Sequence, residues 1–399
     1  MNSHRIAQCL KAFTIIGYLL YSIPVHAQLS AAVHYKPMRA DTLADVITDY
    51  DVKKALLPGE NKASVIVNKT LVPAEGNINF LENMETHLSS RQERKALMGY
   101  LKEFSTAGNE VNYNRSRVKI YYKLANVFAR LRMYPLAMKC FFKTMQYKKG
   151  QQAPYLRIKP LADSVSADTL SVDSGLSTRY LAINAKDDSL FVNDPKPLAL
   201  NDKGEEKSKA VTYQRIVNTF NDGKKAVAYA LLFHVKQPVP GKPRIFRIVN
   251  TGHTFITLIK YNTDSTSVSI SFGFYPQKDN LFSATPLDPS CSGTFKNDNG
   301  HNWDEVMGKF ISKKRFDKIL LLTKSYDGLE YHLSKNNCTD FAIKAASYAG
   351  IGVSDTKGSW PLGHGNNPGI TGQSIITGSV YNTEGKDGLF IDFDVALGK

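Results

Sequence analysis

The sequence predicts an α+β domain built from an antiparallel sheet and helices, preceded by an α-helical module. Residues 41–149 carry mainly helical periodicity, residues 226–274 carry a series of strand-like apolar runs, and helical patterns return after residue 303. Strands followed by segregated helices are typical of the α+β class. With 399 residues and 42% hydrophobic side chains, the chain is long enough for more than one compact unit and too apolar to be disordered.

Residues 1–27 have the pattern of a secretory signal peptide. Arg5 and Lys11 precede the apolar run 12–20, and a small-residue exit ends at Ala27. We therefore expect a periplasmic or secreted protein. Cleavage would remove two basic residues and no acid, so the net charge would fall from +15 to +13. Export argues against nucleic acid as a partner. It favours peptidoglycan or another acidic envelope component, and it leaves peripheral contact with a membrane open.

Residues 28–152 form the expected helical module. A first helix presents one face to a second helix across a turn at Tyr134-Pro135. The facing residues are Tyr121, Leu124, Ala125 and Phe128 on the first helix, and Ala137 and Phe141 on the second. The spacing resembles one tetratricopeptide repeat. Because such units are stabilised by stacking on further copies, a single copy leaves open both a packing role and a role in binding a protein partner.

Residues 153–209 are predicted to be a polar linker with a short strand near residues 180–183, and residues 210–380 the α+β domain. Residues 381–399 are expected to be a tail, and residues 290–293 a loop. Within the domain, helices are expected at 212–220, 303–311, 315–324 and from 338 onward, and strands at 226–235, 245–249, 253–261, 268–274 and 329–333.

Cys338 is the residue with the clearest chemical potential. It follows Asn336-Asn337, which are natural helix caps, and it precedes an apolar helical face that ends at Gly350. A cysteine in the first turn of a helix meets unpaired N–H groups and the positive end of the helix dipole, and both stabilise a thiolate. The same N–H groups can receive an oxyanion. The alternative is that Cys338 is a small buried apolar residue.

A thiolate nucleophile needs a base, and His253 is the candidate among nine histidines. It begins the strand 253–258, so a rigid sheet would hold its imidazole. Gly252 precedes it, and the missing side chain there permits close approach of another backbone. A solvated or structural histidine is the alternative interpretation.

The combination of three segments resembles the papain-like NlpC-type superfamily. These segments are Gly252-His253-Thr254-Phe255-Ile256, Ser271-Phe272-Gly273-Phe274-Tyr275-Pro276 and Asn337-Cys338-Thr339-Asp340-Phe341-Ala342. The order of histidine before cysteine is similar to that of the permuted branch related to lecithin:retinol acyltransferase. The resemblance covers about residues 210–375. It implies that Cys338 attacks an acyl carbon, while His253 takes its proton and later protonates the leaving group.

The resemblance also implies a third polar residue that orients the histidine from the next strand. If the hairpin turns about Asp264, position 253 faces Tyr275, which makes Tyr275 the candidate. It departs from the histidine, asparagine or glutamine usual in the superfamily. An ordinary aromatic residue at a strand end is the alternative interpretation.

We therefore expect an exported thiol hydrolase that cleaves amide bonds in cell-wall peptide. The same Cys338–His253 pair allows an acyltransferase or lipid esterase, and a non-catalytic envelope scaffold stays open as a third hypothesis. No cofactor is expected. No metal is indicated, because the sequence has no HxxxH spacing and no calcium-binding loop. Cys140 and Cys291 remain candidates for a disulfide.

Overall fold

The computed structural model describes part of the chain, all of it within the compact unit Arg39–Lys399. The described residues are 94–95, 97–99, 101, 115–149, 180–184, 186–187, 208–247, 250–277, 280, 283–285, 287–360, 363–384 and 388–393. They form helices and a largely antiparallel sheet, which confirms the α+β class. The predicted signal peptide, most of the linker and residues 394–399 lie outside the described residues.

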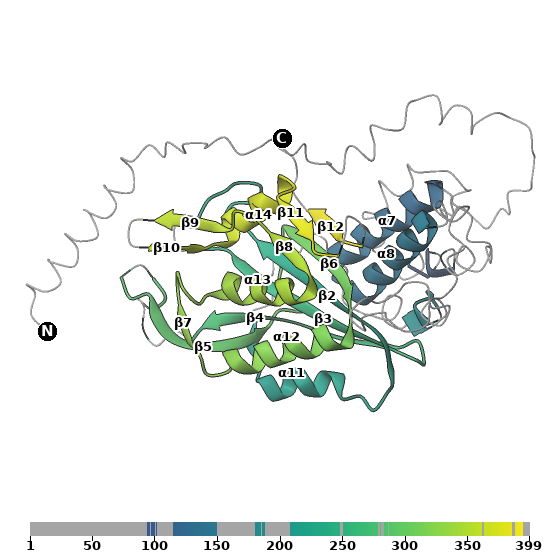
Figure 1. Cartoon of the computed structure of the whole chain (residues 1–399), viewed down its shortest axis with the longest axis horizontal. Helices are drawn as coiled ribbons and strands as arrows, with labels where there is room; N and C mark the ends of the chain where they lie inside the picture. The colour runs from purple at the N-terminus through teal and green to yellow at the C-terminus, as the bar shows by residue number, and fades with distance from the viewer. Residues whose placement is uncertain are drawn as a thin grey trace, which may run out of the picture. The chain divides into compact units, whose positions relative to one another are not determined.

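One eight-stranded sheet organises the fold (Figure 1). The strand order is β1-β5-β4-β3-β2-β6-β12, and β7 pairs with β5. Every neighbouring pair in this sheet is antiparallel. The bounds of its strands are β1 Lys209–Ala210, β2 Ala226–Lys236, β3 His253–Asn262, β4 Ser267–Pro276, β5 Ser290–Asn297, β6 Glu305–Ile311, β7 Glu330–His332 and β12 Phe390–Phe393.

Helices α11, α12 and α13 pack on one face of this sheet. Alternate residues of β2 and β3, such as Leu231, Phe233 and Ile256, point to this face and are fully buried there. The bounds of the three helices are α11 Tyr213–Phe220, α12 Lys313–Tyr326 and α13 Cys338–Ala349. Side-chain caps begin all three helices: Thr212 for α11, Ser312 for α12 and Asn337 for α13.

The opposite face of the sheet is covered by a helix pair, α7 Arg115–Arg130 and α8 Tyr134–Lys149. The predicted facing residues are buried, and Tyr122 and Phe141 pack against Phe390 of β12. Arg130 forms an ion pair with Asp392, 3.1 Å from Nε to Oδ2. The helix pair therefore shares one core with the sheet. The connection is Leu131–Met133, so Tyr134 begins the second helix instead of lying in the turn.

Two predictions between residues 290 and 311 are wrong. Residues 303–311, predicted to be helical, contain strand β6, and residues 290–293, predicted to be a loop, begin β5. Strand β6 lies between β2 and β12 and is covered on both faces: Val306 packs on the α7–α8 side and Met307 on the α13 side. A strand buried on both faces lacks polar alternation, so its sequence pattern resembles that of a buried helix.

Smaller differences occur elsewhere in the chain. The expected strand at 180–183 is a turn whose Leu181 and Ile183 are buried in the core. The expected strand at 245–249 is reduced, in its described part, to a bridge between Arg247 and Asn250. Residues 390–393, placed in the tail, form the edge strand β12, because Phe390 fills the core under the helix pair. Cys140, Cys291 and Cys338 are all free thiols, so the disulfide is absent from the described residues.

The segment after α13 adds two small two-stranded sheets and one helix beside the main sheet. Their bounds are β8 Ile351–Val353, β9 Lys357–Trp360, β10 Gly363–Asn366, α14 Pro368–Ile376 and β11 Val380–Asn382. Strand β10 pairs with β9, and β11 pairs with β8. Within the described ranges, no helix is both long enough and apolar enough to cross a membrane.

Candidate active site

Cys338 is the first residue of α13, as the sequence predicts. The cap is a complete capping box: Asn337 Oδ1 accepts the N–H groups of Thr339 and Asp340, and Asp340 Oδ2 accepts the Asn337 N–H at 2.9 Å. The Cys338 side chain is 6% exposed. The cap therefore fixes the thiol at the positive end of a buried helix.

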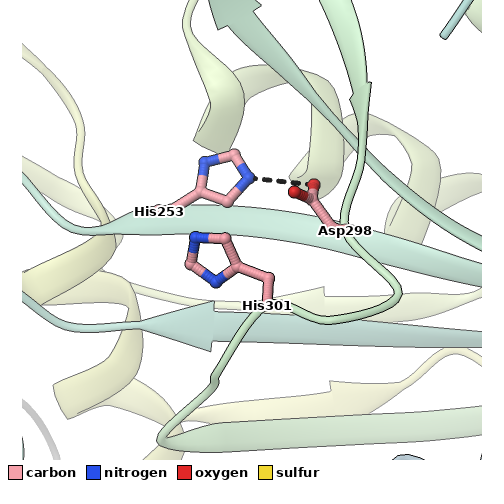
Figure 2. A group of neighbouring side chains, drawn as sticks. All are labelled: His253, Asp298 and His301. Atoms are coloured by element: carbon pink, nitrogen blue, oxygen red, sulfur yellow. Dashed lines mark hydrogen bonds and ion pairs between the residues drawn. The ribbon is translucent and has the colours of Figure 1, made fainter. Parts of the chain in front are cut away.

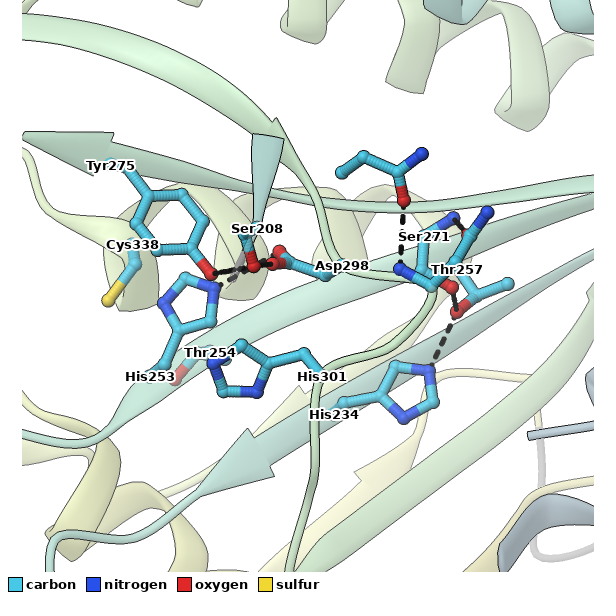
Figure 3. Close-up of polar contacts among 12 residues, drawn as sticks. Ser208, His234, His253, Thr254, Thr257, Ser271, Tyr275, Asp298, His301 and Cys338 are labelled. Carbon is cyan, nitrogen blue, oxygen red and sulfur yellow. Dashed lines mark hydrogen bonds and ion pairs between the residues drawn. The ribbon is translucent and has the colours of Figure 1, made fainter. Parts of the chain in front are cut away.

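His253 opens β3 and meets a carboxylate that comes from a distant turn. Its Nε2 atom lies 3.2 Å from Asp298 Oδ2, and both side chains are buried (Figure 3). Asp298 follows the last residue of β5 and is completely buried. Figure 3 shows the other ring nitrogen of His253, Nδ1, on the side of Cys338. The three side chains therefore lie in line as thiol, imidazole and carboxylate.

Two glycines allow this line to form. A Cβ atom on Gly273 of β4 would lie 2.6 Å from His253 Nε2 and 2.8 Å from Asp298 Oδ2. A Cβ atom on Gly252 would lie 2.4 Å from the Lys236 backbone oxygen, and Gly252 has a φ of +73°. Both positions therefore require glycine, and the close backbone approach predicted at Gly252 is present.

Tyr275 lies beside His253, with ring centroids 4.2 Å apart. The register of β3 and β4 pairs Ile256 with Phe272, which is the register that a turn centred on Asp264 predicts. The Tyr275 hydroxyl, however, donates to Asp298 Oδ1 at 2.5 Å. Ser208 donates to the same oxygen at 2.8 Å. Tyr275 therefore positions the carboxylate, and Asp298 is the residue that bonds the imidazole.

The electrostatics favour a thiolate–imidazolium pair. Burial opposes ionisation of Cys338, but the hydrogen bond and positive charge of His253 outweigh it, so the pKa of the thiol is lowered. Burial opposes the charged form of His253 as well, and for an imidazole this effect lowers the pKa. The charge and hydrogen bond of Asp298, together with the Cys338 thiolate, instead raise the pKa of His253 to about 9. Each charge stabilises the other, so the ionised form of the Cys338–His253 pair is favoured over what burial alone would allow.

Tyr331 of β7 brings a buried hydroxyl to the same thiol. Its hydroxyl interacts with both the Cys338 thiol and the Cys338 backbone N–H group. Burial and the neighbouring thiolate raise the pKa of Tyr331, so the hydroxyl keeps its proton and remains a donor. A phenol O–H and a helix N-terminal N–H beside one nucleophile are the kinds of donor that stabilise an oxyanion.

Three side chains at this site also have the composition of a cation site (Figure 2). His253, Asp298 and His301 each offer one ligand atom, and these atoms lie within 4.8 Å of one another. The His301 Nδ1 atom lies 2.7 Å from the Asn302 backbone oxygen, an outer contact typical of metal-binding histidines. Two imidazoles and one carboxylate suit Zn²⁺. A cation there would take the Nε2 lone pair of His253.

Sequence reasoning found Cys338, His253 and Tyr275 but missed Asp298, His301 and Tyr331. Asp298 and His301 lie in the turn Asn297-Asp298-Asn299-Gly300 and just after it, where acidic and polar residues are common for local reasons. The feature that distinguishes Asp298 from other turn residues is its complete burial, and the sequence does not reveal that burial. Searches against protein-family models, curated proteins and solved structures found no match to this chain.

Proposed function

We propose that this chain is a thiol hydrolase that cleaves an amide bond, and that its substrate is cell-wall peptide. The observation that carries the proposal is the buried line of Cys338, His253 and Asp298. A nucleophile, a base and a group that orients the base make up the minimal set for covalent acyl transfer. The papain-like, permuted NlpC-type architecture is part of this proposal, as is export to the cell envelope.

The proposed reaction begins with attack of the Cys338 thiolate on the amide carbonyl carbon. The carbonyl oxygen becomes an oxyanion, and we expect the Cys338 N–H and the Tyr331 hydroxyl, which interact beside the thiol, to donate hydrogen bonds to it. His253 gives its Nδ1 proton to the leaving amine as the C–N bond breaks, and a thioester remains on Cys338. Water then loses a proton to His253 and attacks the thioester, and the C–S bond breaks. This step releases a carboxylic acid, which loses its proton to solvent, and it restores the Cys338 thiolate beside the protonated His253.

Asp298 has the same charge throughout this cycle. It holds the His253 ring in place through Nε2 and stabilises the imidazolium that exists before the amine leaves. Tyr275 and Ser208 hold the other carboxylate oxygen. Asp298 therefore acts as the orienting member, and it supplies the role for which Tyr275 was predicted.

The first test is the pH dependence of iodoacetamide labelling, followed by peptide mapping of each cysteine. Cys338 should be labelled well below pH 8, whereas Cys140, whose pKa burial raises, should stay unlabelled in the folded chain. The half-buried Cys291 is the internal comparison. Absence of labelling at Cys338 below pH 8 would overturn the proposed activity and leave a non-catalytic scaffold.

The second test is turnover of peptidoglycan fragments. Cys338→Ala should abolish release of new amine and carboxylate groups without a change in the circular dichroism spectrum. Cys291→Ala should retain activity. If the acyl group is recovered on an added amine or alcohol instead of water, the same residues serve an acyltransferase. If Cys338→Ala still hydrolyses the fragments, Cys338 is not the nucleophile.

A further inference from the structure

A cavity of about 340 Å³ is lined in part by residues 332–335, which lie just before the helix that carries Cys338. Its walls come from the end of β7 and the segment after it, from the residue before β5, and from the β9–β10 hairpin. The lining residues are Pro289, His332, Leu333, Ser334, Lys335, Trp360, Gly363 and His364. None of these residues takes part in the thiol–imidazole–carboxylate line, so the proposed chemistry does not account for the cavity.

Hydrogen bonds attach the cavity wall to the cap of α13. The Asn337 side-chain amide donates to the backbone oxygens of Leu333 and Asn366, both at 2.9 Å. Asn366 in turn donates to Asp340 Oδ1 at 2.6 Å. A Cβ on Gly365 would lie 2.1 Å from the Ser334 oxygen, so strand β10 packs directly on the cavity segment. The cavity and the Cys338 helix therefore form one rigid unit.

The charged and polar groups of the cavity suit an anion. Lys335 supplies a positive charge, and the lining includes two imidazoles but no aspartate or glutamate. His332 Nδ1 accepts the Ser334 N–H at 3.1 Å, so the proton of the neutral ring resides on Nε2, which makes Nε2 a donor. Asp340, whose charge acts on His332, accepts hydrogen bonds from Asn337 and Asn366 in the cap.

The cavity also has an aromatic wall. Trp360 packs on Gly363 of the facing strand, where a Cβ would lie 2.6 Å from the indole ring. Its half-buried indole supplies apolar surface next to Lys335, His332 and His364. A carboxylate on a short apolar stem matches this pairing, because the stem can lie against the indole while the oxygens meet the donors.

We propose that this cavity is a substrate subsite for a carboxylate group. The inference rests on the proposed function, and it deepens that function by making an acidic residue beside the scissile bond the feature that the enzyme recognises. Lys335 and the imidazoles of His332 and His364 would bind the carboxylate, and Trp360 would contact the carbon stem. The hydrogen-bonded cap would hold that residue at a fixed offset from the Cys338 thiol.

Trp360 provides a direct test, because the chain has only two tryptophans and Trp303 can be replaced. In a Trp303→Phe, Cys338→Ala background, N-acetylglutamate should change the Trp360 fluorescence at lower concentration than N-acetylglutamine. Lys335→Ala and His332→Gln should each weaken the glutamate response, and Lys344→Ala, at an exposed position of α13, should not. Equal responses to the two ligands, or a glutamate response that survives Lys335→Ala and His332→Gln, would overturn the subsite.

A second measurement links the cavity to the thiol. The labelling rate of Cys338 with iodoacetate, divided by its rate with iodoacetamide, should fall about 3–10-fold in Lys335→Ala because a nearby positive charge attracts the anion. The ratio should not change in Lys344→Ala. A glutamate-selective Trp360 response in a chain whose Cys338 is unreactive would overturn the proposed function and leave the carboxylate site. A reactive Cys338 in a chain without a glutamate-selective Trp360 response would overturn the carboxylate subsite and leave the proposed function in place.

Discussion

Two buried histidines on neighbouring strands behave in opposite ways. His234 on β2 and His253 on β3 both stack on Phe255, with interplanar angles of 8° and 11°. Burial lowers the pKa of His234 well below 6.5, and the charge of His301 lowers it further. The pKa of His253 rises to about 9, although burial acts on it in the same direction. His234 is therefore neutral near pH 7, and His253 is charged.

The difference lies in the group that each imidazole contacts through Nε2. His234 Nε2 meets the hydroxyl of Thr257 at 2.9 Å, and that hydroxyl bonds Ser271 at 2.7 Å. His253 Nε2 meets the carboxylate of Asp298. A neutral hydroxyl satisfies a buried imidazole without stabilising its charge, whereas a carboxylate offsets the desolvation cost. The same sheet face thus holds one neutral and one charged histidine.

Replacing Asp298 should make His253 resemble His234, and among the changes that test the contrast between the two histidines it should have the largest effect. In Asp298→Asn the pKa of His253 falls because the negative charge is lost, so less thiolate exists at neutral pH. Turnover should drop by about 10²-fold or more, within the range of general acid–base contributions. The pH midpoint of Cys338 labelling should rise. An unchanged midpoint would contradict the role assigned to Asp298.

Tyr275→Phe is the matched control for this variant. It removes the hydroxyl that holds Asp298 Oδ1 but keeps the ring beside His253 and the carboxylate charge. We expect a smaller fall in turnover than in Asp298→Asn and a smaller shift of the labelling midpoint. An equal fall would mean that the tyrosine acts on the reaction directly.

Zinc offers a second way to remove the proton from His253. Zn²⁺ held by His253, Asp298 and His301 would occupy the Nε2 atom of His253 in place of a proton, which would leave the imidazole a poor acid. Micromolar Zn²⁺ should therefore inhibit turnover, and EDTA should restore it. His301→Gln should raise the inhibitory concentration at least about 10-fold, the smallest loss usual for an outer-shell change. Zinc that activates Cys338→Ala would instead indicate metal-dependent hydrolysis.

The pH profile of turnover should show the same contrast. His253 must carry a proton to release the amine, and its raised pKa keeps that proton until about pH 9. As the pH increases, activity should therefore rise through the lowered pKa of the Cys338 thiol. Well above pH 9 it should fall about tenfold per pH unit. In Asp298→Asn the alkaline limb should move to lower pH. An alkaline limb near 6.5 in the native chain would mean that Asp298 does not stabilise the imidazolium.

The sequence predicts the parts of this site that depend on local pattern. Asn337 before an apolar helical face predicts the capped helix of Cys338, and the turn at Asp264 predicts that Tyr275 lies beside His253. Asp298 depends on long-range pairing, because β5 must first pair with β4 to bring the turn after it to His253. The sequence predicts a helix where strand β6 lies for a related reason: burial on both faces removes the alternation that identifies a strand.

The smallest predicted effect concerns the structural histidine. Thr257→Val has nearly the same shape but leaves His234 Nε2 and the Ser271 hydroxyl without the partner they share. The free energy of unfolding, measured by urea denaturation, should fall by about 1–3 kcal/mol. The pKa of His234 is lowered in the folded state, so below pH 6.5 the imidazole binds a proton in the unfolded chain before it does so in the folded chain. The free energy of unfolding of the unsubstituted chain should therefore fall as the pH drops below 6.5. The labelling midpoint of Cys338 should stay unchanged in Thr257→Val. A shifted midpoint would mean that the two histidines are coupled through the strand between them, and that the carboxylate alone does not set the chemistry of His253.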